Sequence, residues 1–183
     1  MKRLFLVFTL AAIPLFVAPA AHADAVTCSG SIGAVVVDEL VVPAGATCTL
    51  TGTGVRGNLS VEAGATLEAS GIRVGGNVSG DGAKSIDIQA SGIRGNAQLK
   101  DGGSVTLTDT RIRGDVTVEG NGGAVSITGN TIRGSLQADN NTGGVDISNN
   151  RIGNNLQCQG NDPAPTGGQN RVLGNKQDQC ATL

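Results

Sequence analysis

The sequence predicts an all-β fold: a single-domain parallel β-helix, or β-solenoid, of about seven coils of ~20 residues each. Three observations predict it. Similar units recur along the chain at a nearly constant interval, and apolar and polar residues alternate within each unit. Residues 24–183 also contain no aromatic side chain from which a bulky globular core could be built.

The first 23 residues have the pattern of a secretory signal peptide. They begin with Lys2 and Arg3, continue through a long apolar run and end in "AHA". Pro14 and Pro19 interrupt the run, which argues against a transmembrane anchor. We therefore expect residues 24–183 to form the mature protein, without a transmembrane segment, in the periplasm or outside the cell.

Composition narrows the function classes. All three Phe, the only Met and the only His lie within residues 1–23, and the chain has no Trp or Tyr. Residues 24–183 keep 11 Lys and Arg against 15 Asp and Glu, a formal net charge of −4 that argues against nucleic acid as a partner. The lack of histidine excludes Ser-His-Asp chemistry.

The units align on an apolar residue that stands next to arginine or before a glycine-rich turn. These residues recur at intervals of 17 to 21 and comprise Val35, Val55, Ile72, Ile93, Ile112, Ile132, Ile152 and Val172. Short alternating runs between glycine-rich turns predict strands stacked about 4.8 Å apart. The variable interval favours a right-handed helix over the stricter left-handed hexapeptide type.

The alignment predicts columns of equivalent residues in the interior. They are Ile72, Ile93, Ile112, Ile132 and Ile152; Val105, Val125 and Val145; and Leu107, Ile127 and Ile147. Two asparagine columns follow from the same register, Asn121, Asn141 and Asn161, and Asn130, Asn150 and Asn170. We expect these amides to form hydrogen-bonded ladders that support the turns.

Four cysteines in an exported chain predict two disulfides. The spacings of 20 and 22 residues favour Cys28–Cys48 and Cys158–Cys180 among the three connectivities, one bridge at each end of the stack. Residues 161–183 depart from the repeat and are expected to form a C-terminal cap. We expect no metal site and no cofactor.

Arginines supply the candidate binding site. Arg56, Arg73, Arg94, Arg113 and Arg133 each follow the aligned residue, so the sequence predicts one outward column; Arg111, Arg151 and Arg171 precede it. Two interpretations stay open. Nearby acids, namely Asp87, Asp109, Asp115 and Asp146, neutralise the column, or the column binds an anion of acidic polysaccharide, lipopolysaccharide or teichoic acid.

Other chemistry has weaker support. "TDTRIRGD" places Asp109 and Asp115 around two arginines, yet the chain lacks the long loops and aromatic platforms of polysaccharide lyases and hydrolases. We therefore expect no catalytic residues and no enzyme. Glycine- and aspartate-rich stretches do not recur at calcium-binding spacing, and acids interrupt the "TLT" column that ice binding would require.

Units such as "GNLSVEAGATLEASG" and "RGDVTVEGNGGAVSI", within residues 54–160, resemble those of bactofilin-type polymer-forming β-helix proteins. "PAGATCTL" at residues 43–50 and the segment 153–180 resemble small secreted bacterial β-helix proteins. The signal peptide and cysteines differ from bactofilins. The resemblance therefore implies self-association, end to end or lateral, rather than a cytoskeletal role.

The sequence favours a secreted, non-enzymatic structural or adhesive β-solenoid of the cell envelope or extracellular matrix. Its expected partners are further copies of itself or anionic envelope glycans. The alternative is an anionic-polysaccharide binding module that uses the arginines. A polysaccharide lyase or hydrolase is the third hypothesis.

Overall fold

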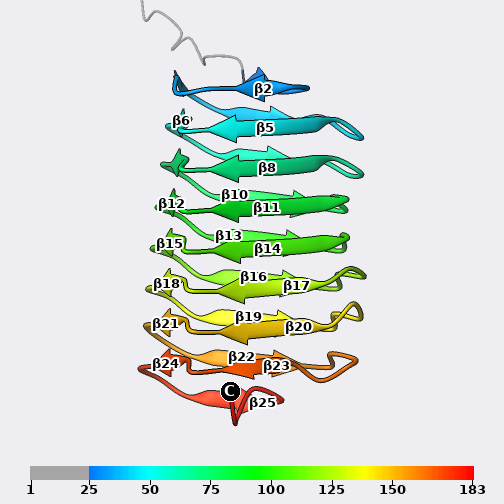
Figure 1. Cartoon of the computed structure of the whole chain (residues 1–183), viewed down its shortest axis with the longest axis vertical. Helices are drawn as coiled ribbons and strands as arrows, with labels where there is room; N and C mark the ends of the chain where they lie inside the picture. Colours follow the sequence, from blue (N-terminus) through cyan, green and yellow to red (C-terminus); the bar gives the residue numbers. More distant parts are fainter. Residues whose placement is uncertain (1–24) are drawn as a thin grey trace, which may run out of the picture.

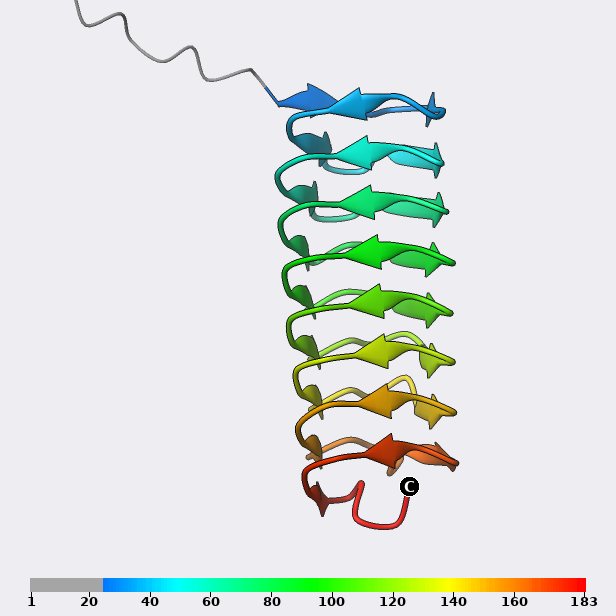
Figure 2. The ribbon, with the colours of Figure 1, turned by 90° about the vertical axis from the view of Figure 1, so that its left-hand side faces the viewer.

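The computed structural model describes residues 25–183; the predicted signal peptide, residues 1–23, lies outside them. The described chain forms a stack of similar turns, with three parallel sheets along its sides and no helix (Figure 1). From the N-terminal end, each turn runs along the front sheet, passes the short strands at the left and returns behind (Figures 1 and 2). This winding is right-handed, as the sequence predicts.

Each sheet takes one strand from successive turns. Sheet A comprises β1 (Val26–Thr27), β4 (Leu40–Val42), β7 (Leu59–Val61), β10 (Val78–Asp81), β13 (Ala97–Lys100), β16 (Val116–Glu119), β19 (Leu136–Asp139), β22 (Leu156–Gln159) and β25 (Lys176–Asp178). Sheet B comprises β2 (Ser31–Ile32), β5 (Thr47–Thr51), β8 (Thr66–Ser70), β11 (Ser85–Gln89), β14 (Ser104–Thr108), β17 (Val125–Thr128), β20 (Val145–Ser148) and β23 (Thr166–Gly168). Sheet C comprises β3 (Val36–Val37), β6 (Gly54–Val55), β9 (Arg73–Val74), β12 (Gly92–Ile93), β15 (Arg111–Ile112), β18 (Thr131–Ile132), β21 (Arg151–Ile152) and β24 (Arg171–Val172).

The register of sheet C defines eight turns, one more than the sequence suggested. One inward residue of each turn stacks on the next, at intervals of 18 to 20 residues: Val37, Val55, Val74, Ile93, Ile112, Ile132, Ile152 and Val172. The predicted places of Val35 and Ile72 in this column were wrong. The column uses Val37 and Val74, two residues further on: Ile72 and Val74 both flank Arg73, and Val35 and Val37 belong to one run of three valines.

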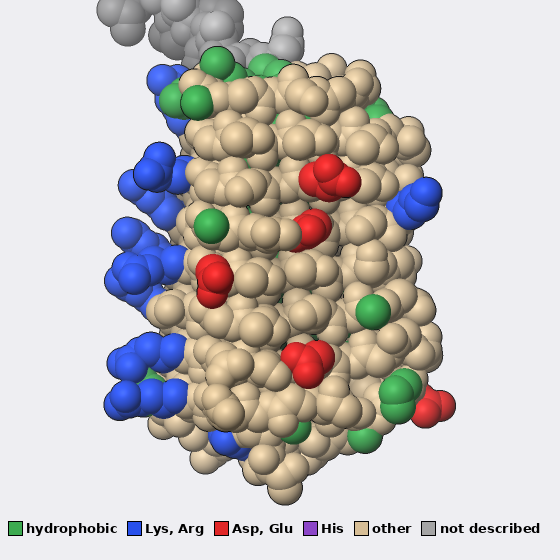
Figure 3. Space-filling view, viewed as in Figure 1, with side chains coloured by type: hydrophobic (Ala, Val, Ile, Leu, Met, Phe, Trp, Pro, Cys, Tyr) green, Lys and Arg blue, Asp and Glu red, His purple; other side chains and the backbone are tan. Residues whose placement is uncertain are grey.

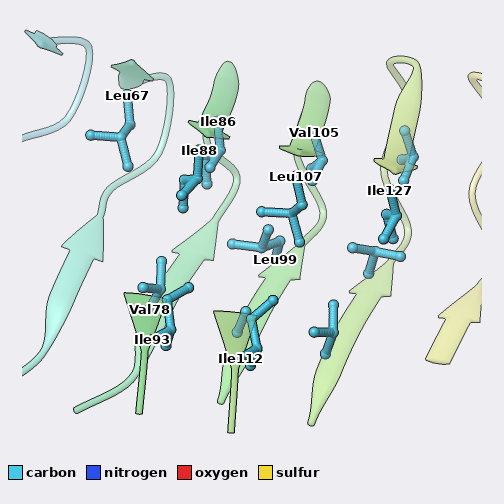
Figure 4. Close-up of a cluster of buried hydrophobic side chains, with 14 of the residues drawn as sticks. Leu67, Val78, Ile86, Ile88, Ile93, Leu99, Val105, Leu107, Ile112 and Ile127 are labelled. Atoms are coloured by element: carbon cyan, nitrogen blue, oxygen red, sulfur yellow. The ribbon is translucent and has the colours of Figure 1, made fainter. Parts of the chain in front are cut away.

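Stacked aliphatic side chains fill the interior. The columns Val105–Val125–Val145 and Leu107–Ile127–Ile147 lie in register between neighbouring strands of sheet B, as predicted. Figure 4 shows labelled residues of all three sheets, among them Ile88, Leu99 and Ile112, pointing into the same interior. Thin layers of Val, Ile, Leu and Ala therefore make a continuous core without aromatic rings.

Both predicted asparagine ladders are present and buried. The backbone N–H and the side-chain amide of Asn121 donate to Oδ1 of Asn141, each at 3.0 Å. Asn141 donates to Asn161 in the same way, and its amide also donates to the Val118 carbonyl at 3.1 Å. Asn130, Asn150 and Asn170 repeat this arrangement. The ladders thus satisfy the buried backbone donors where each turn bends.

A third ladder, not predicted from the sequence, runs along the corner between sheets C and A. Each member accepts from the backbone N–H of the next, and the members are Asn58, Asn77, Asn96, Asp115, Ser135, Asn155 and Asn175. Most of these bonds are exposed to solvent. Recurring Gly-Asn, Gly-Asp and Gly-Ser pairs in the sequence mark this corner.

The predicted disulfide pairs are confirmed. The Cα atoms of Cys28 and Cys48 lie 5.5 Å apart, and those of Cys158 and Cys180 lie 5.2 Å apart. The bridges do not join vertically equivalent residues. Ser31 pairs with Thr49, which places Cys48 beside Gly30 rather than Cys28, and Cys158 stacks on Asp178 rather than Cys180. In each bridge, at either end of the stack, the two cysteines therefore occupy non-equivalent positions of their turns.

Residues 161–178 continue the columns as the final turn rather than departing from the helix. β23, β24 and β25 pair in parallel with the preceding turn. Beyond them the chain curves beneath the stack, where Cys180 and Leu183 join the hydrophobic core (Figure 2). This short segment closes the C-terminal end of the core.

Substitution of a buried ladder member tests the ladders. Asn141→Ala leaves two buried donors of Asn121 without an acceptor, so the free energy of unfolding should fall by about 2–5 kcal/mol in guanidinium denaturation. The matched Asn58→Ala removes one exposed acceptor, which water replaces, and should cost at most about 1 kcal/mol. Equal losses from the two substitutions would contradict this account.

Candidate anion-binding face

All eight arginines of residues 25–183 lie on the outer surface of sheet C, and all are exposed. Figure 3 shows their basic side chains gathered along the edge where Figure 1 places the short strands of that sheet. The sequence requires this placement because each arginine flanks an inward residue by one position, so its side chain points outward. Fourteen acidic residues and three lysines occupy the rest of the described chain.

The arginines form two columns rather than the single column that the sequence suggested. Arg73 was wrongly placed with Arg56 and Arg94; it precedes the inward residue, and Gly75 follows it. We call the two columns preceding and following, after the position of their residues relative to the inward residue. From the second turn to the eighth, the preceding column contains Gly54, Arg73, Gly92, Arg111, Thr131, Arg151 and Arg171. The following column reads Arg56, Gly75, Arg94, Arg113, Arg133, Gly153 and Leu173. Basic residues therefore extend to the last turn.

This arrangement separates most neighbouring charges. Two arginines in adjacent turns but opposite columns are separated by one strand spacing and by two residues along the strand, so their backbones lie about 8 Å apart. Two arginines in adjacent turns of the same column lie about 4.8 Å apart. In water the repulsion between unit charges falls from about 0.9 to about 0.5 kcal/mol over that change. Two sets of arginines are exceptions, since they follow one another in a single column: Arg94, Arg113 and Arg133 in one column, and Arg151 and Arg171 in the other.

The predicted neutralising aspartates do not pair with the arginines. Among residues 25–183 one arginine forms an ion pair: Arg56 Nη1 lies 2.8 Å from Asp38 Oδ1, with both side chains largely exposed. Asp87 and Asp146 lie on the outer surface of sheet B, in a column with Thr106 and Ser126. They interrupt the threonine column of that face, as the sequence indicated.

Asp109 and Asp115, the best catalytic candidates of the sequence, occupy structural positions. Asp109 has a positive φ of 50° at the turn between β14 and β15, a conformation that aspartate tolerates better than most residues. Oδ1 of Asp115 accepts from the N–H of Ser135 at 2.8 Å as a member of the corner ladder. The carboxylate of Asp115 thus has a structural hydrogen bond, whereas the φ of Asp109 concerns its backbone alone.

On sheet A, by contrast, a lysine forms an ion pair with a neighbouring carboxylate. Lys100 Nζ lies 2.7 Å from Oε2 of Glu119, the next residue in its column on sheet A. The hydrogen bond to Glu119, together with the charge of that carboxylate, raises the pKa of Lys100 above its usual value. The contrast shows that the stack can pair neighbouring charges, and that sheet C leaves seven arginines without an ion pair among the described residues.

A groove of about 730 Å³ follows sheet C over turns two to five. It is lined by five arginines, Arg56, Arg73, Arg94, Arg111 and Arg113, and by glycines that include Gly54, Gly75 and Gly92. In turns two to four, arginine and glycine exchange columns from one turn to the next, so each glycine has an arginine on the other side of the inward residue; the fifth turn has Arg111 and Arg113. Such a surface can bind carboxylate, sulfate or phosphate groups through bidentate hydrogen bonds.

No family model, curated protein or solved structure matches the chain. Among residues 25–183, no helix has the length and apolar character needed to cross a membrane. The structure establishes the parallel β-solenoid itself, and none of these comparisons links the chain to bactofilin-type proteins.

The role of Asp115 can be tested by conservative substitution. Asp115→Asn keeps an oxygen that accepts from Ser135, as Asn96 already does for Asp115 one turn earlier, so the melting temperature should stay unchanged. Asp115→Ala removes the acceptor and should cost at most about 1 kcal/mol, because water reaches the exposed N–H. A larger loss in Asp115→Asn than in Asp115→Ala would show that the carboxylate charge has a role beyond the ladder.

Proposed function

We propose that this protein is an exported, non-enzymatic β-solenoid that adheres to anionic polymers of the cell envelope or extracellular matrix through the arginines of sheet C. One observation carries the proposal: all eight arginines of residues 25–183 share one face, and only Arg56 forms an ion pair there. Two disulfides are typical of oxidising compartments, where such polymers occur.

The length of the face favours a polymer over a small anion. Arginines occur in every turn from the second, with Arg56, to the eighth, with Arg171. Six strand spacings make this span about 29 Å. A small anion would contact two or three of these residues, whereas a linear polyanion can neutralise the arginines of both columns and thereby release the polyanion's bound counterions. The acidic remainder of the surface limits binding to this side.

Charge-matched variants test the proposal. Arg94→Gln, Arg113→Gln and Arg133→Gln together should reduce binding to an immobilised acidic polysaccharide at least tenfold and flatten its salt dependence, because three phosphate- or carboxylate-binding groups are lost. Lys84→Gln, Lys100→Gln and Lys176→Gln remove the same charge from other faces and should change binding less than twofold. The readout is affinity by biolayer interferometry across a salt series.

The proposal fails if the wild type binds none of a panel of uronate, sulfate and phosphate polymers. It also fails if the lysine variant loses as much affinity as the arginine variant, since net charge alone would then explain binding. Unchanged circular dichroism spectra in both variants would show that the fold is retained.

A second candidate function, end-to-end self-association, is favoured by the two ends of sheet C. Val35 and Val36 are 52% and 63% exposed in the first turn, and Leu173 is 59% exposed in the last. β3 and β24 are the end strands of this sheet, so each leaves one edge unpaired among the described residues. Stacking β24 of one copy on β3 of another would cover these apolar side chains and pair both edges.

Leu173→Ser combined with Val36→Ser should therefore lower the sedimentation coefficient at high protein concentration, because the end-to-end contact loses its apolar surface. The control is Val26→Ser, which changes an exposed valine of the first turn on sheet A and should leave association unchanged. A wild-type protein that sediments as a monomer at every concentration would contradict this second function.

A further inference from the structure

The arginines of sheet C include one series that alternates between its two columns over six successive turns. One arginine per turn gives the series Arg56, Arg73, Arg94, Arg111, Arg133 and Arg151, in the following, preceding, following, preceding, following and preceding columns. Arg113 adds a second charge in the fifth turn, and Arg171 lies beyond the series. The basic groups thus form a zigzag with one step of about 4.8 Å per turn.

Small residues occupy most of the positions opposite the zigzag. Gly54, Gly75, Gly92 and Gly153 face Arg56, Arg73, Arg94 and Arg151 across their turns, and Thr131 faces Arg133. Packing requires two of these glycines, since a Cβ at Gly75 or Gly153 would collide with the carbonyl of the preceding turn. Within the groove, Gly54, Gly75 and Gly92 lie opposite the alternating arginines of the second to fourth turns.

Gly92 differs because the fold does not require a glycine there. A Cβ built at this residue meets no atom within 4 Å, and its φ lies outside the left-handed region. Glycine weakens a strand, and the equivalent positions in neighbouring turns are held by Arg73 and Arg111. The absence of a side chain at Gly92 has one evident structural consequence, which is to keep the centre of the groove open.

We propose that the groove binds a linear polyuronate in a flat, two-fold ribbon conformation, with one sugar residue per turn of the solenoid. This inference rests on the proposed function and names its ligand class. In a flat β-1,4-linked ribbon, successive sugars are turned over, so their carboxylates alternate between the two edges. The length of one extended pyranose is close to the rise of one turn, so each carboxylate meets the arginine on its own side.

The same geometry argues against other polyanions at this site. A helical α-1,4-linked polyuronate does not place successive carboxylates on alternate edges. The charges of polyphosphate follow one another more closely than the turns of the solenoid. Both would engage the face by net charge alone, without regard to which column holds an arginine. Register with the zigzag therefore distinguishes the ribbon from a general attraction to polyanions.

Two variants test the register without changing net charge. Gly92→Arg with Arg94→Gly moves one guanidinium to the other column, into a position where a side chain meets open space. Gly92→Val fills the hollow and should leave the melting temperature unchanged or higher, because valine suits a strand better than glycine. The probes are a β-1,4-linked mannuronate oligomer, an α-1,4-linked galacturonate oligomer of equal length and polyphosphate, measured by calorimetry at one ionic strength.

We expect the wild type to bind the β-1,4-linked oligomer at least tenfold more tightly than the α-1,4-linked oligomer. Both variants should lose at least tenfold in affinity for the β-1,4-linked oligomer, and less than twofold for polyphosphate. Equal binding of the three probes by the wild type, or unchanged binding of the ribbon by the column-exchange variant, would overturn the inference while leaving the proposed function standing. Loss of all binding in the wild type would overturn both.

Discussion

The stacking of each residue on its equivalent in the next turn, about 4.8 Å away, is the constraint on which the structure depends. A shift of one residue would turn an aliphatic side chain outward and bring a polar one into the core, so every turn must keep the same order of inward and outward positions. The same constraint lets Asn121 donate to Asn141, and it converts single arginines into columns. Core, ladders and charged face are three consequences of one repeat.

The repeat made the fold predictable, because alternation and a nearly constant interval are local properties of the chain. The disulfide pairs and both asparagine ladders followed from the same spacing. The register of the third turn did not follow from the spacing, since Ile72 and Val74 both flank Arg73. Gly-Asn pairs, such as Gly76-Asn77, would have resolved it, because the inward residue always stands three positions before the ladder residue.

The candidate site depended on that one register. With Ile72 in the column, Arg73 joins Arg56 and Arg94 in a crowded stripe that would require acids beside it. With Val74 in the column, Arg73 moves to the opposite column, and distance relieves much of the repulsion. The aspartates then serve elsewhere, as Asp115 does in the corner ladder. The groove could not be predicted from the sequence, because the sequence does not distinguish a glycine that packing requires from a glycine that leaves the surface open.

Arginine Nε–Hε resonances observed during titration with a β-1,4-linked uronate oligomer test the central claim most directly, because each guanidinium of sheet C reports its own contact. The account predicts that Arg56, Arg73, Arg94, Arg111, Arg133 and Arg151 shift together and saturate at one concentration, while Arg171, outside the alternating series, does not. Equal shifts of all the arginines, or none, would contradict it.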